Sequence, residues 1–407
     1  MSFTRTVAEH RDAILAATPP LTPRRLPIEE ALGRTSAEDV VATLEIPAFE
    51  NSAMDGYAVR SADGAAPRTV VADIPAGAVP SVEIGLGEAA RIMTGAPLPV
   101  GADAIVPHEQ THEPFREVAP GAVVRMDAAP AAGAHIRRRG DDVSVGDVVV
   151  AAGQRLGPLQ RSAAAAAGAA SVLVRPAPRV VVIASGDELV APGEPVGPGQ
   201  IPESNGLLLD GLVRGADAEI AGLLRVGDDP AALRRLLADV EADGPDAIVL
   251  TGGASVGAYE VVRDVLEPTG VQFLTVAMQP GKPQGYGTVG GGIPVFCLPG
   301  NPVSVAVSFE AFVRPALLQM QGRREVLRPV MRLRTAAGWR TPPGREQFMP
   351  VALDRSDSSA WTVRPATAGG SGSHRAGALA LAEAWAVIPA SVEQVAEGDA
   401  VDVMLVQ

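Results

Sequence analysis

The sequence predicts a multi-domain chain that combines a parallel-sheet α/β domain with two regions of mostly β structure. Between Pro178 and Gly322, β-branched runs alternate with stretches whose apolar residues recur at helical spacing, as in a parallel sheet covered by helices. Residues 46–143 and the residues after Pro329 contain instead short apolar runs broken by Gly and Pro, which is typical of β-rich domains. A chain of 407 residues is also too long for one simple core.

The elements follow in chain order from these patterns. Residues 5–17 are expected to form an amphipathic helix, and residues 147–176 a strand, a loop, an Ala-rich helix and a second strand. The α/β strands are expected at RVVVIASGDEL, AEIAGLLRV, DAIVLTGG, VQFLTVAM and IPVFCLPG, with helices between them and a long helix from Asn301. Short alternating runs at the end of the chain predict a small β-barrel or sandwich.

Charge and cysteine content exclude several classes of protein. The formal net charge of −13 argues against a general nucleic-acid or anionic-membrane binder, although a local positive pocket for a small anion stays possible. A single cysteine, Cys297, excludes an internal disulfide framework and a Cys-rich zinc site. The first residues lack the apolar core of a signal peptide, and no apolar run is expected to reach membrane-spanning length. A cytoplasmic protein is therefore expected.

Four Gly-rich segments follow predicted strands of the α/β part, at the sheet edge where ligands bind in such folds. In TGGASVG, two glycines remove side chains so that backbone N–H groups can approach an anion. In PGNPVS, a strand meets a helix N-terminus, which favours an anion. Tight turns of any α/β domain would explain one such loop, but four at one edge favour a binding site. The residues concerned include Gly252, Gly253, Ser255, Pro299, Gly300, Asn301 and Ser304.

Lys282, in the segment QPGKPQGYG, is the only lysine, so the other 33 of the 34 Lys and Arg residues are arginine. A solvated loop position is the usual fate of a lysine. A chain that otherwise uses arginine throughout favours a specific role, because a compact ammonium suits a tetrahedral oxyanion that a guanidinium fork would crowd. We therefore interpret Lys282 as an anion ligand.

Several acidic residues lie in turns rather than on helix faces. Taken singly, acids beside glycine are usually turn formers. Together, and near an anion site, they are suited to bind Mg²⁺ that bridges phosphates. These residues are Asp55, Asp142, Glu188, Asp228 and Asp229.

The ordered segments FENSAMDGYAVR, RIMTGAPLPVGADAIVP, IRRRGDDV, SGDEL, TGGASVG, PGKP and LPGNPVS resemble the signatures of the molybdopterin molybdenumtransferase family, which includes bacterial MoeA and the E domain of gephyrin. The resemblance covers essentially the whole chain. It implies an elongated homodimer whose α/β domain is similar to molybdopterin adenylyltransferase. The implied parts are an N-terminal helix in 1–26 packed on the α/β domain, a discontinuous linker in 27–45 and 144–177, a β-rich lobe in 46–143, the α/β domain in 178–326 and a C-terminal β-barrel in 327–407.

The resemblance also implies a reaction. Family members take adenylylated molybdopterin and molybdate, insert molybdenum into the pterin dithiolene and release AMP with Mg²⁺ present. The molybdopterin adenylyltransferase and molybdoenzymes are implied as partners. Matched motif by motif, the implied catalytic residues are Asp55, Thr94, Asp142, Glu188 and Lys282, with Glu188 and Asp228 as metal-side acids. Lys282, Ser304, Arg345 and Ser373 match positions that line a molybdate pocket, and the Asp55 loop is expected to reach the site from the other protomer.

Two departures keep alternatives open. Relatives usually have lysine where this chain has Gln279, and often have aspartates where it has Ala258, Tyr259 and Glu260. A catalytically weak paralogue that binds pterin or acts as a scaffold dimer is therefore the second hypothesis. Adenylyl transfer to molybdopterin is the third, and the two additional β-rich regions argue against it.

Overall fold

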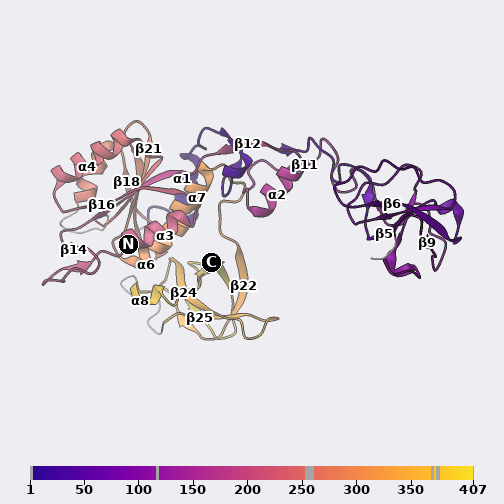
Figure 1. Cartoon of the computed structure of the whole chain (residues 1–407). Coiled ribbons are helices and arrows are strands. Elements are labelled where there is room, and N and C mark those ends of the chain that lie inside the picture. The colour runs from indigo at the N-terminus through magenta and orange to yellow at the C-terminus, as the bar shows by residue number, and fades with distance from the viewer. Residues whose placement is uncertain (1–2, 116–118, 253–260, 368–370, 373–375, 407) are drawn as a thin grey trace.

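The computed structural model describes residues 3–115, 119–252, 261–367, 371–372 and 376–406. The chain is elongated, with the α/β domain at one end, a β-rich lobe at the other and a slender linker between them (Figure 1). The C-terminal β domain lies beside the α/β domain rather than beside the lobe (Figure 1). The predicted fold class is therefore confirmed, whereas the exact domain limits stay a prediction.

The α/β domain is built on a six-stranded sheet of order β16-β13-β17-β21-β20-β18. The first four strands of that order are parallel, but β20 runs antiparallel to both β21 and β18. The sheet is thus mixed, not wholly parallel as the sequence patterns predicted. Its strands are β13 (Arg179–Ser185), β16 (Glu219–Val226), β17 (Ala247–Thr251), β18 (Gln272–Thr275), β20 (Pro283–Val289) and β21 (Ile293–Leu298).

Strand β20 was missed because its sequence, PQGYGTV, reads as a glycine-rich loop. The structure gives one of those glycines a packing role. A Cβ atom on Gly285 would lie 2.8 Å from the Cβ of Cys297 and 2.9 Å from the Phe273 ring, so only glycine lets the three strands approach this closely.

Helices cover both faces of the sheet, and alternate residues of β13 point into separate cores. Val180 and Val182 pack with α3, α6 and α7, whereas Val181 and Ile183 pack with α4 and α5. The helices are α3 (Asn205–Arg214), α4 (Pro230–Asp243), α5 (Val261–Leu266), α6 (Pro302–Ser308), the π-helical turn η6 (Phe309–Val313) and α7 (Arg314–Met320). A small parallel pair, β14 (Leu189–Val190) and β15 (Ile201–Pro202), and a 3₁₀ turn, η5 (Glu267–Thr269), complete the domain.

The helix from Pro302 to Met320 is long and apolar enough, by length and composition, to cross a membrane. The expectation that no apolar run reaches such a length is therefore wrong for this stretch. Within the protein 89% of its apolar window is buried, which is the situation of a core helix. The N-terminal helix α1 (Val7–Ala16) packs Val7 and Ile14 into the same core, and Thr6 and Glu9 form a capping box at its start.

The linker is formed by two separate segments that pair with each other. Strand β12 pairs with both β1 and β2, and β11 pairs with β3. The N-terminal segment supplies β1 (Arg24–Pro27), η1 (Ile28–Glu30), β2 (Thr35–Ser36) and β3 (Val40–Val41); the later segment supplies β11 (Val148–Val150), α2 (Pro158–Ala166) and β12 (Ser171–Arg175).

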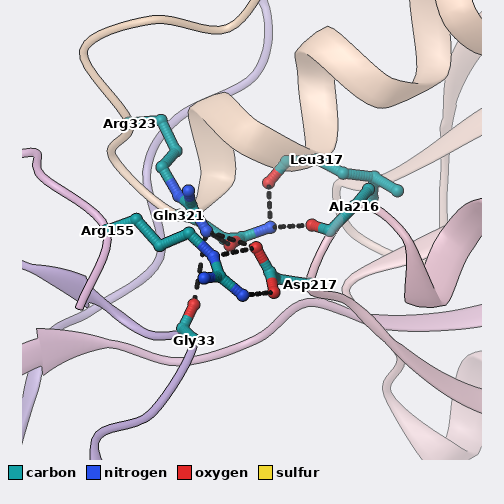
Figure 2. Close-up of polar contacts among 7 residues, drawn as sticks. All are labelled: Gly33, Arg155, Ala216, Asp217, Leu317, Gln321 and Arg323. Atoms are coloured by element: carbon teal, nitrogen blue, oxygen red, sulfur yellow. Dashed lines mark hydrogen bonds and ion pairs between the residues drawn. The ribbon is translucent and has the colours of Figure 1, made fainter. Parts of the chain in front are cut away.

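One polar cluster joins the linker to the α/β domain (Figure 2). Asp217 accepts hydrogen bonds from Arg155 of the linker at 2.6 and 2.8 Å and from Arg323 at 2.7 Å. Burial alone would raise the pKa of Asp217, but the hydrogen bonds and charges of Arg155 and Arg323 outweigh it and lower that pKa. The carboxylate therefore stays charged and links the two domains.

The β-rich lobe holds a five-stranded sheet of order β8-β5-β7-β6-β9 around two small apolar cores. Its strands are β5 (Gly56–Val59), β6 (Arg68–Ile74), β7 (Glu88–Ile92), β8 (Ala104–Pro107) and β9 (Val123–Val124). The lobe also contains the pair β4 (Asn51–Ser52) and β10 (Ile136–Arg137) and the 3₁₀ turns η2 (Ser61–Asp63) and η3 (His108–Gln110).

The C-terminal domain is a closed barrel, as the sequence predicted. Strands pair in the cycle β24-β25-β22-β28-β26 and back to β24. Their bounds are β22 (Val330–Thr335), β24 (Glu346–Asp354), β25 (Thr362–Pro365), β26 (Ala384–Ile388) and β28 (Ala400–Leu405), with the side pair β23 (Trp339–Arg340) and β27 (Gln394–Val395) and the short helix α8 (Ala376–Leu379). The α/β domain adds one strand to this sheet, β19 (Met278–Gln279), which pairs in parallel with β24.

Candidate functional site

The first part of the candidate site lies where the strand order of the α/β sheet reverses. The chain leaves β13 toward β16 on one side and later returns to β17 on the other, which makes the carboxyl end of β13 the switch point of the sheet. A cleft of about 320 Å³ opens there, which we call the switch-point cleft. Its lining includes Ser185, Glu188, Asn205, Thr251, Gly252, Gly300 and Asn301.

Close backbone packing shapes the floor of this cleft. Gly252 has a φ of +95°, and a Cβ atom there would lie 2.2 Å from the carbonyl oxygen of Ser185. Only glycine therefore fits. Asn205 holds the neighbouring loops together, because its Nδ2 donates to Thr251 Oγ1 at 3.0 Å and to the Gly300 carbonyl at 2.8 Å.

The second part is an adjoining cleft of about 240 Å³, which we call the Lys282 cleft. Lys282, Ser304 and Arg345 all line it, although they come from three separate parts of the sequence. Gly300 and Asn301 line both clefts, so the two adjoin one another. The structure thus brings together the predicted ammonium, hydroxyl and guanidinium.

Strand direction explains how the Lys282 loop reaches this edge. Because β18 and β21 are each antiparallel to β20, they run in the same direction, and both end at the same edge of the sheet. The loop after β18 therefore lies beside the loop after β21, which leads into α6. Ser304 sits in the first turn of that helix and is 2% exposed.

The barrel completes the Lys282 cleft through the β19–β24 pairing. In that register Met278 lies opposite Glu346, and Gln279 lies opposite Gln347. Arg345, which directly precedes β24, donates from Nη1 to Gln279 Oε1 at 2.7 Å. Lys282 is half-buried, and its Nζ lies 6.0 Å from the centre of the Phe3 ring.

This arrangement is suited to bind a small oxyanion. An ammonium and a guanidinium supply charge, and the Ser304 hydroxyl and the backbone N–H groups at the start of α6 supply further donors. The sequence predicted an anion pocket in an acidic protein, and anion binding here stays a prediction.

The acids of the site separate into different roles. Glu188 is exposed and lines the switch-point cleft. The amide of Asp228 donates to Asp187 Oδ1 at 3.0 Å, and the amide of Asp187 donates to Asp228 Oδ2 at 3.4 Å, which ties the loops after β13 and β16 together. Asp229 caps α4 by accepting from the Ala231 amide, so of the two neighbours Asp228 is the one free of a capping role. Among the described residues no group of three or more His, Cys, Asp or Glu side chains could hold a metal ion.

Three predicted residues lie on the other side of the molecule. Asp55 and Thr94 meet in the β-rich lobe, where Thr94 donates to Asp55 Oδ1 from its amide and its hydroxyl, each at 2.7 Å. These hydrogen bonds lower the pKa of Asp55. Asp142 is exposed at the base of the lobe, where its amide donates to the Ile46 carbonyl. Within one chain the lobe is remote from both clefts (Figure 1).

Other positions were missed or are not described. Gly253, Ser255, Ala258 and Ser373 lie outside the described residues.

Ser371, two residues before the predicted Ser373, lines the Lys282 cleft and accepts a hydrogen bond from Gln347 at 2.9 Å. The segment GSGSH offers two serines, and no periodicity there separates one from the other. Asn205 was not predicted as a site residue.

Comparison with known proteins agrees with this architecture. Sequence models match the MoeA N-terminal region (domain I and II) at residues 5–168, a probable molybdopterin binding domain at 181–319 and the MoeA C-terminal region (domain IV) at 332–406. Two relatives come from Mycobacterium tuberculosis. Molybdopterin molybdenumtransferase 2 is 42% identical, with 97% of this chain and 98% of the relative covered; molybdopterin molybdenumtransferase 1 is 36% identical, with 98% of each chain covered.

A solved structure supports the same assignment. The molybdopterin biosynthesis MoeA protein from Pyrococcus horikoshii superposes with a TM-score of 0.79 at 31% identity, and 98% of each chain is covered. The three matched regions together span nearly the whole chain, in the order in which the linker and lobe, the α/β domain and the barrel occur. The chain therefore belongs to the MoeA family of molybdopterin molybdenumtransferases.

Proposed function

We propose that the protein is a molybdopterin molybdenumtransferase that acts in molybdenum cofactor biosynthesis on molybdate and adenylylated molybdopterin. In this reaction Mo–S bonds to the pterin dithiolene form as Mo–O bonds break, and the displaced oxygen leaves as water. A water molecule cleaves the phosphoanhydride, and AMP is released. Both substrates are anions, and both sulfur ligands belong to the pterin.

One observation carries the proposal. Lys282, Ser304 and Arg345 line a single cleft that adjoins, at Gly300 and Asn301, the glycine-lined cleft at the switch point. A tetrahedral dianion and a diphosphate need two such neighbouring sites, one with compact cations and one with exposed backbone N–H groups.

The residues divide the work accordingly. Lys282 and Arg345 would neutralise molybdate, and Ser304 would donate a hydrogen bond to it. The loop at Gly252 and the turn from Pro299 to Asn301 would hold the diphosphate through backbone N–H groups. Binding both anions side by side would keep the dithiolene next to molybdenum, which is the positioning that the reaction needs.

The exposed acids suit a bound Mg²⁺. Magnesium is usually held by one or two carboxylates together with substrate phosphates rather than by a complete protein cage. Glu188 lines the switch-point cleft. Asp228 lies on a loop whose backbone amide is hydrogen-bonded to Asp187, the residue before Glu188. When bound, Mg²⁺ would neutralise charge on the diphosphate oxygens.

The lobe enters the proposal through a second copy of the chain. Asp55 and Thr94 are remote from both clefts of their own chain, so we propose that the protein acts as a cytoplasmic homodimer whose lobe completes the partner's site. The molybdopterin adenylyltransferase and molybdoenzymes are the proposed upstream and downstream partners.

The test is an assay of AMP release. Purified protein is incubated with adenylylated molybdopterin, Mg²⁺ and varied molybdate, and AMP and active cofactor are measured. We expect molybdate-dependent AMP release. ATP-dependent adenylylation of molybdopterin, without molybdate, would favour the adenylyltransferase function instead.

A second candidate function is favoured by Gln279. An uncharged amide stands where relatives usually have lysine, and it accepts a hydrogen bond from Arg345. A pocket with one charge fewer would bind molybdate less well, as expected of a catalytically weak paralogue that holds the pterin or serves as a scaffold. Tight binding of adenylylated molybdopterin with no AMP release, even at high molybdate, would support this function.

A further inference from the structure

A third cavity, in the C-terminal barrel, has no role in the function proposed so far. It has a volume of about 710 Å³, which is within the range of small-molecule sites. We call it the barrel cavity and define it by Gln279, Trp339, Arg340, Gln347, Arg364 and Ser371. Unlike the switch-point cleft and the Lys282 cleft, it combines an aromatic ring with two guanidinium groups.

Buried hydrogen bonds hold the wall of the barrel cavity in place. Trp339 Nε1 donates to Gln347 Oε1 at 3.0 Å, and Gln347 Nε2 donates to Ser371 Oγ at 2.9 Å. Gln347 is 3% exposed and Ser371 5% exposed, so the indole is fixed by side chains that solvent hardly reaches. Thr367 also lines the cavity, and its hydroxyl is buried with no hydrogen-bond partner among the described residues.

The barrel cavity adjoins the Lys282 cleft. Gln279 and Ser371 line both of them, just as Gly300 and Asn301 line both the Lys282 cleft and the switch-point cleft. The Lys282 cleft therefore adjoins each of the other two spaces, which share no lining residue with each other.

The parts of adenylylated molybdopterin also follow one another in a fixed covalent order. The adenosine and diphosphate form one end, the dithiolene lies in the middle, and the pterin forms the other end. The proposed function assigns the diphosphate to the switch-point cleft and molybdate, with the dithiolene beside it, to the Lys282 cleft. Among the described residues, the barrel cavity shares lining with the Lys282 cleft and none with the switch-point cleft, so it is the space left for the pterin end.

We infer that the barrel cavity binds the pterin ring system of the substrate, an inference that rests on the proposed function. The chemistry of the two matches. A pterin presents a flat aromatic face, which suits the Trp339 indole, and carbonyl and ring-nitrogen acceptors, which suit the donors of Arg340 and Arg364. Met349 and Pro365 add apolar lining, which a site for a phosphate alone would not need.

The test uses neopterin, a free pterin that has no phosphate, sulfur or nucleotide. Full-length protein is titrated with it, and quenching of tryptophan emission is recorded. We expect saturable binding that Trp339→Ala and Arg364→Gln each weaken about tenfold or more. The matched controls are Trp361→Ala and Arg332→Gln, which change barrel residues that lie outside the cavity.

A second titration with AMP separates this site from the rest of the cleft. Trp339→Ala and Arg364→Gln are expected to leave AMP affinity unchanged. Thermal melting shows whether Trp339→Ala folds. If it does not, Arg364→Gln alone tests the pterin site, because Arg364 is exposed and its substitution should not disturb the fold. Absence of saturable neopterin binding, equal weakening in the controls, or binding of inorganic phosphate in place of neopterin at this site would each overturn the inference.

The test of the pterin site and the test of the proposed transferase function can fail independently of each other. Neopterin binding that depends on Trp339, in a protein that never releases AMP, supports the pterin site and contradicts the transferase. AMP release in a protein whose neopterin affinity is unaffected by Trp339→Ala and Arg364→Gln supports the transferase and contradicts the pterin site.

Discussion

Arg345 Nη1 donates a 2.7 Å hydrogen bond to Gln279 Oε1, and this contact joins the C-terminal barrel to the α/β domain at the Lys282 cleft. The two residues are 66 positions apart in sequence. The contact follows from the pairing of β19 with β24, which sets Gln279 opposite Gln347. It also places a neutral amide where the family resemblance implies a lysine.

Gln279→Lys is expected to strengthen molybdate binding about threefold to tenfold. A second ammonium adds Coulombic attraction for a dianion, and this gain exceeds the loss of the Arg345 hydrogen bond at the effective dielectric of such a cleft. Equilibrium dialysis with molybdate measures the change. Gln272→Lys is the matched control, because Gln272 also accepts a hydrogen bond from an arginine, Arg5, but lies at the amino end of β18. An equal gain in the control would assign the effect to net charge alone.

Lys282→Ala is expected to weaken molybdate binding by about 10- to 100-fold, the value of a charge-assisted hydrogen bond of roughly 1.5–3 kcal/mol. Lys282→Arg restores the charge but not the compact shape, so it should recover only part of the affinity. AMP release at increasing molybdate gives the second measurement. A molybdate titration of Lys282→Ala that matches the wild type would remove Lys282 from the mechanism.

Gly252→Ala is expected to destabilise the loop after β17 and to abolish binding of the diphosphate end of the substrate. The added Cβ would clash with the Ser185 carbonyl at 2.2 Å, in addition to the strain of a positive φ. Gly270→Ala separates the two effects, because Gly270 has a φ of +101° but nothing within 4 Å of its Cβ position. AMP affinity and melting temperature are the measurements. Similar losses in both variants would contradict a specific role for the close approach.

Asp217→Asn is expected to lower the free energy of unfolding by about 2 kcal/mol, because it breaks a partly buried charge cluster between two domains. Asparagine tolerates the left-handed backbone at this position, where φ is +54°, so the substitution removes the charge and little else. Asp210→Asn is the control, since Asp210 pairs with Arg214 within one helix and should cost under about 0.5 kcal/mol. Urea denaturation compares the two.

The same carboxylate gives a pH dependence with a definite sign. The pKa of Asp217 is lower in the folded protein than in the unfolded chain, so its stabilisation is complete at neutral pH and is lost as the pH falls through the folded value. Wild type and Asp217→Asn should therefore differ in stability at pH 7 and converge between about pH 5 and pH 2. A difference that stays constant across this range would contradict the charge-based explanation.

A mixture of two inactive variants tests the proposed dimer. If the lobe of one protomer completes the cleft of its partner, a heterodimer of Asp55→Ala and Lys282→Ala contains one site with both residues intact. Random refolding makes half of the dimers mixed, so activity should return to roughly a quarter of the wild-type value. If Asp55 acted within its own chain, every site would lack one residue, and the mixture would stay inactive.

Local patterns in the sequence determined much of the fold. The strands at 179–185, 247–251 and 293–298 are buried apolar runs, and the helix at 230–243 has a regular apolar face, so each could be identified from residues close together in the chain. The Gly-rich turns and the isolated Lys282 could be identified in the same way. Strand β20 could not, because its glycines serve contacts with Cys297 and Phe273 that only the assembled sheet creates.

The composition of the site was decided by tertiary structure. A strand of two residues, β19, has no periodicity to detect, yet its pairing with β24 brings Arg345 and Ser371 to the Lys282 loop. The sequence alone specified which residues are chemically suited to hold an oxyanion. Contacts between domains decide which of these residues share a cleft, and they leave Asp55 and Thr94 outside it within one chain. The sequence could not show this, because such contacts join residues whose spacing in the sequence carries no signal.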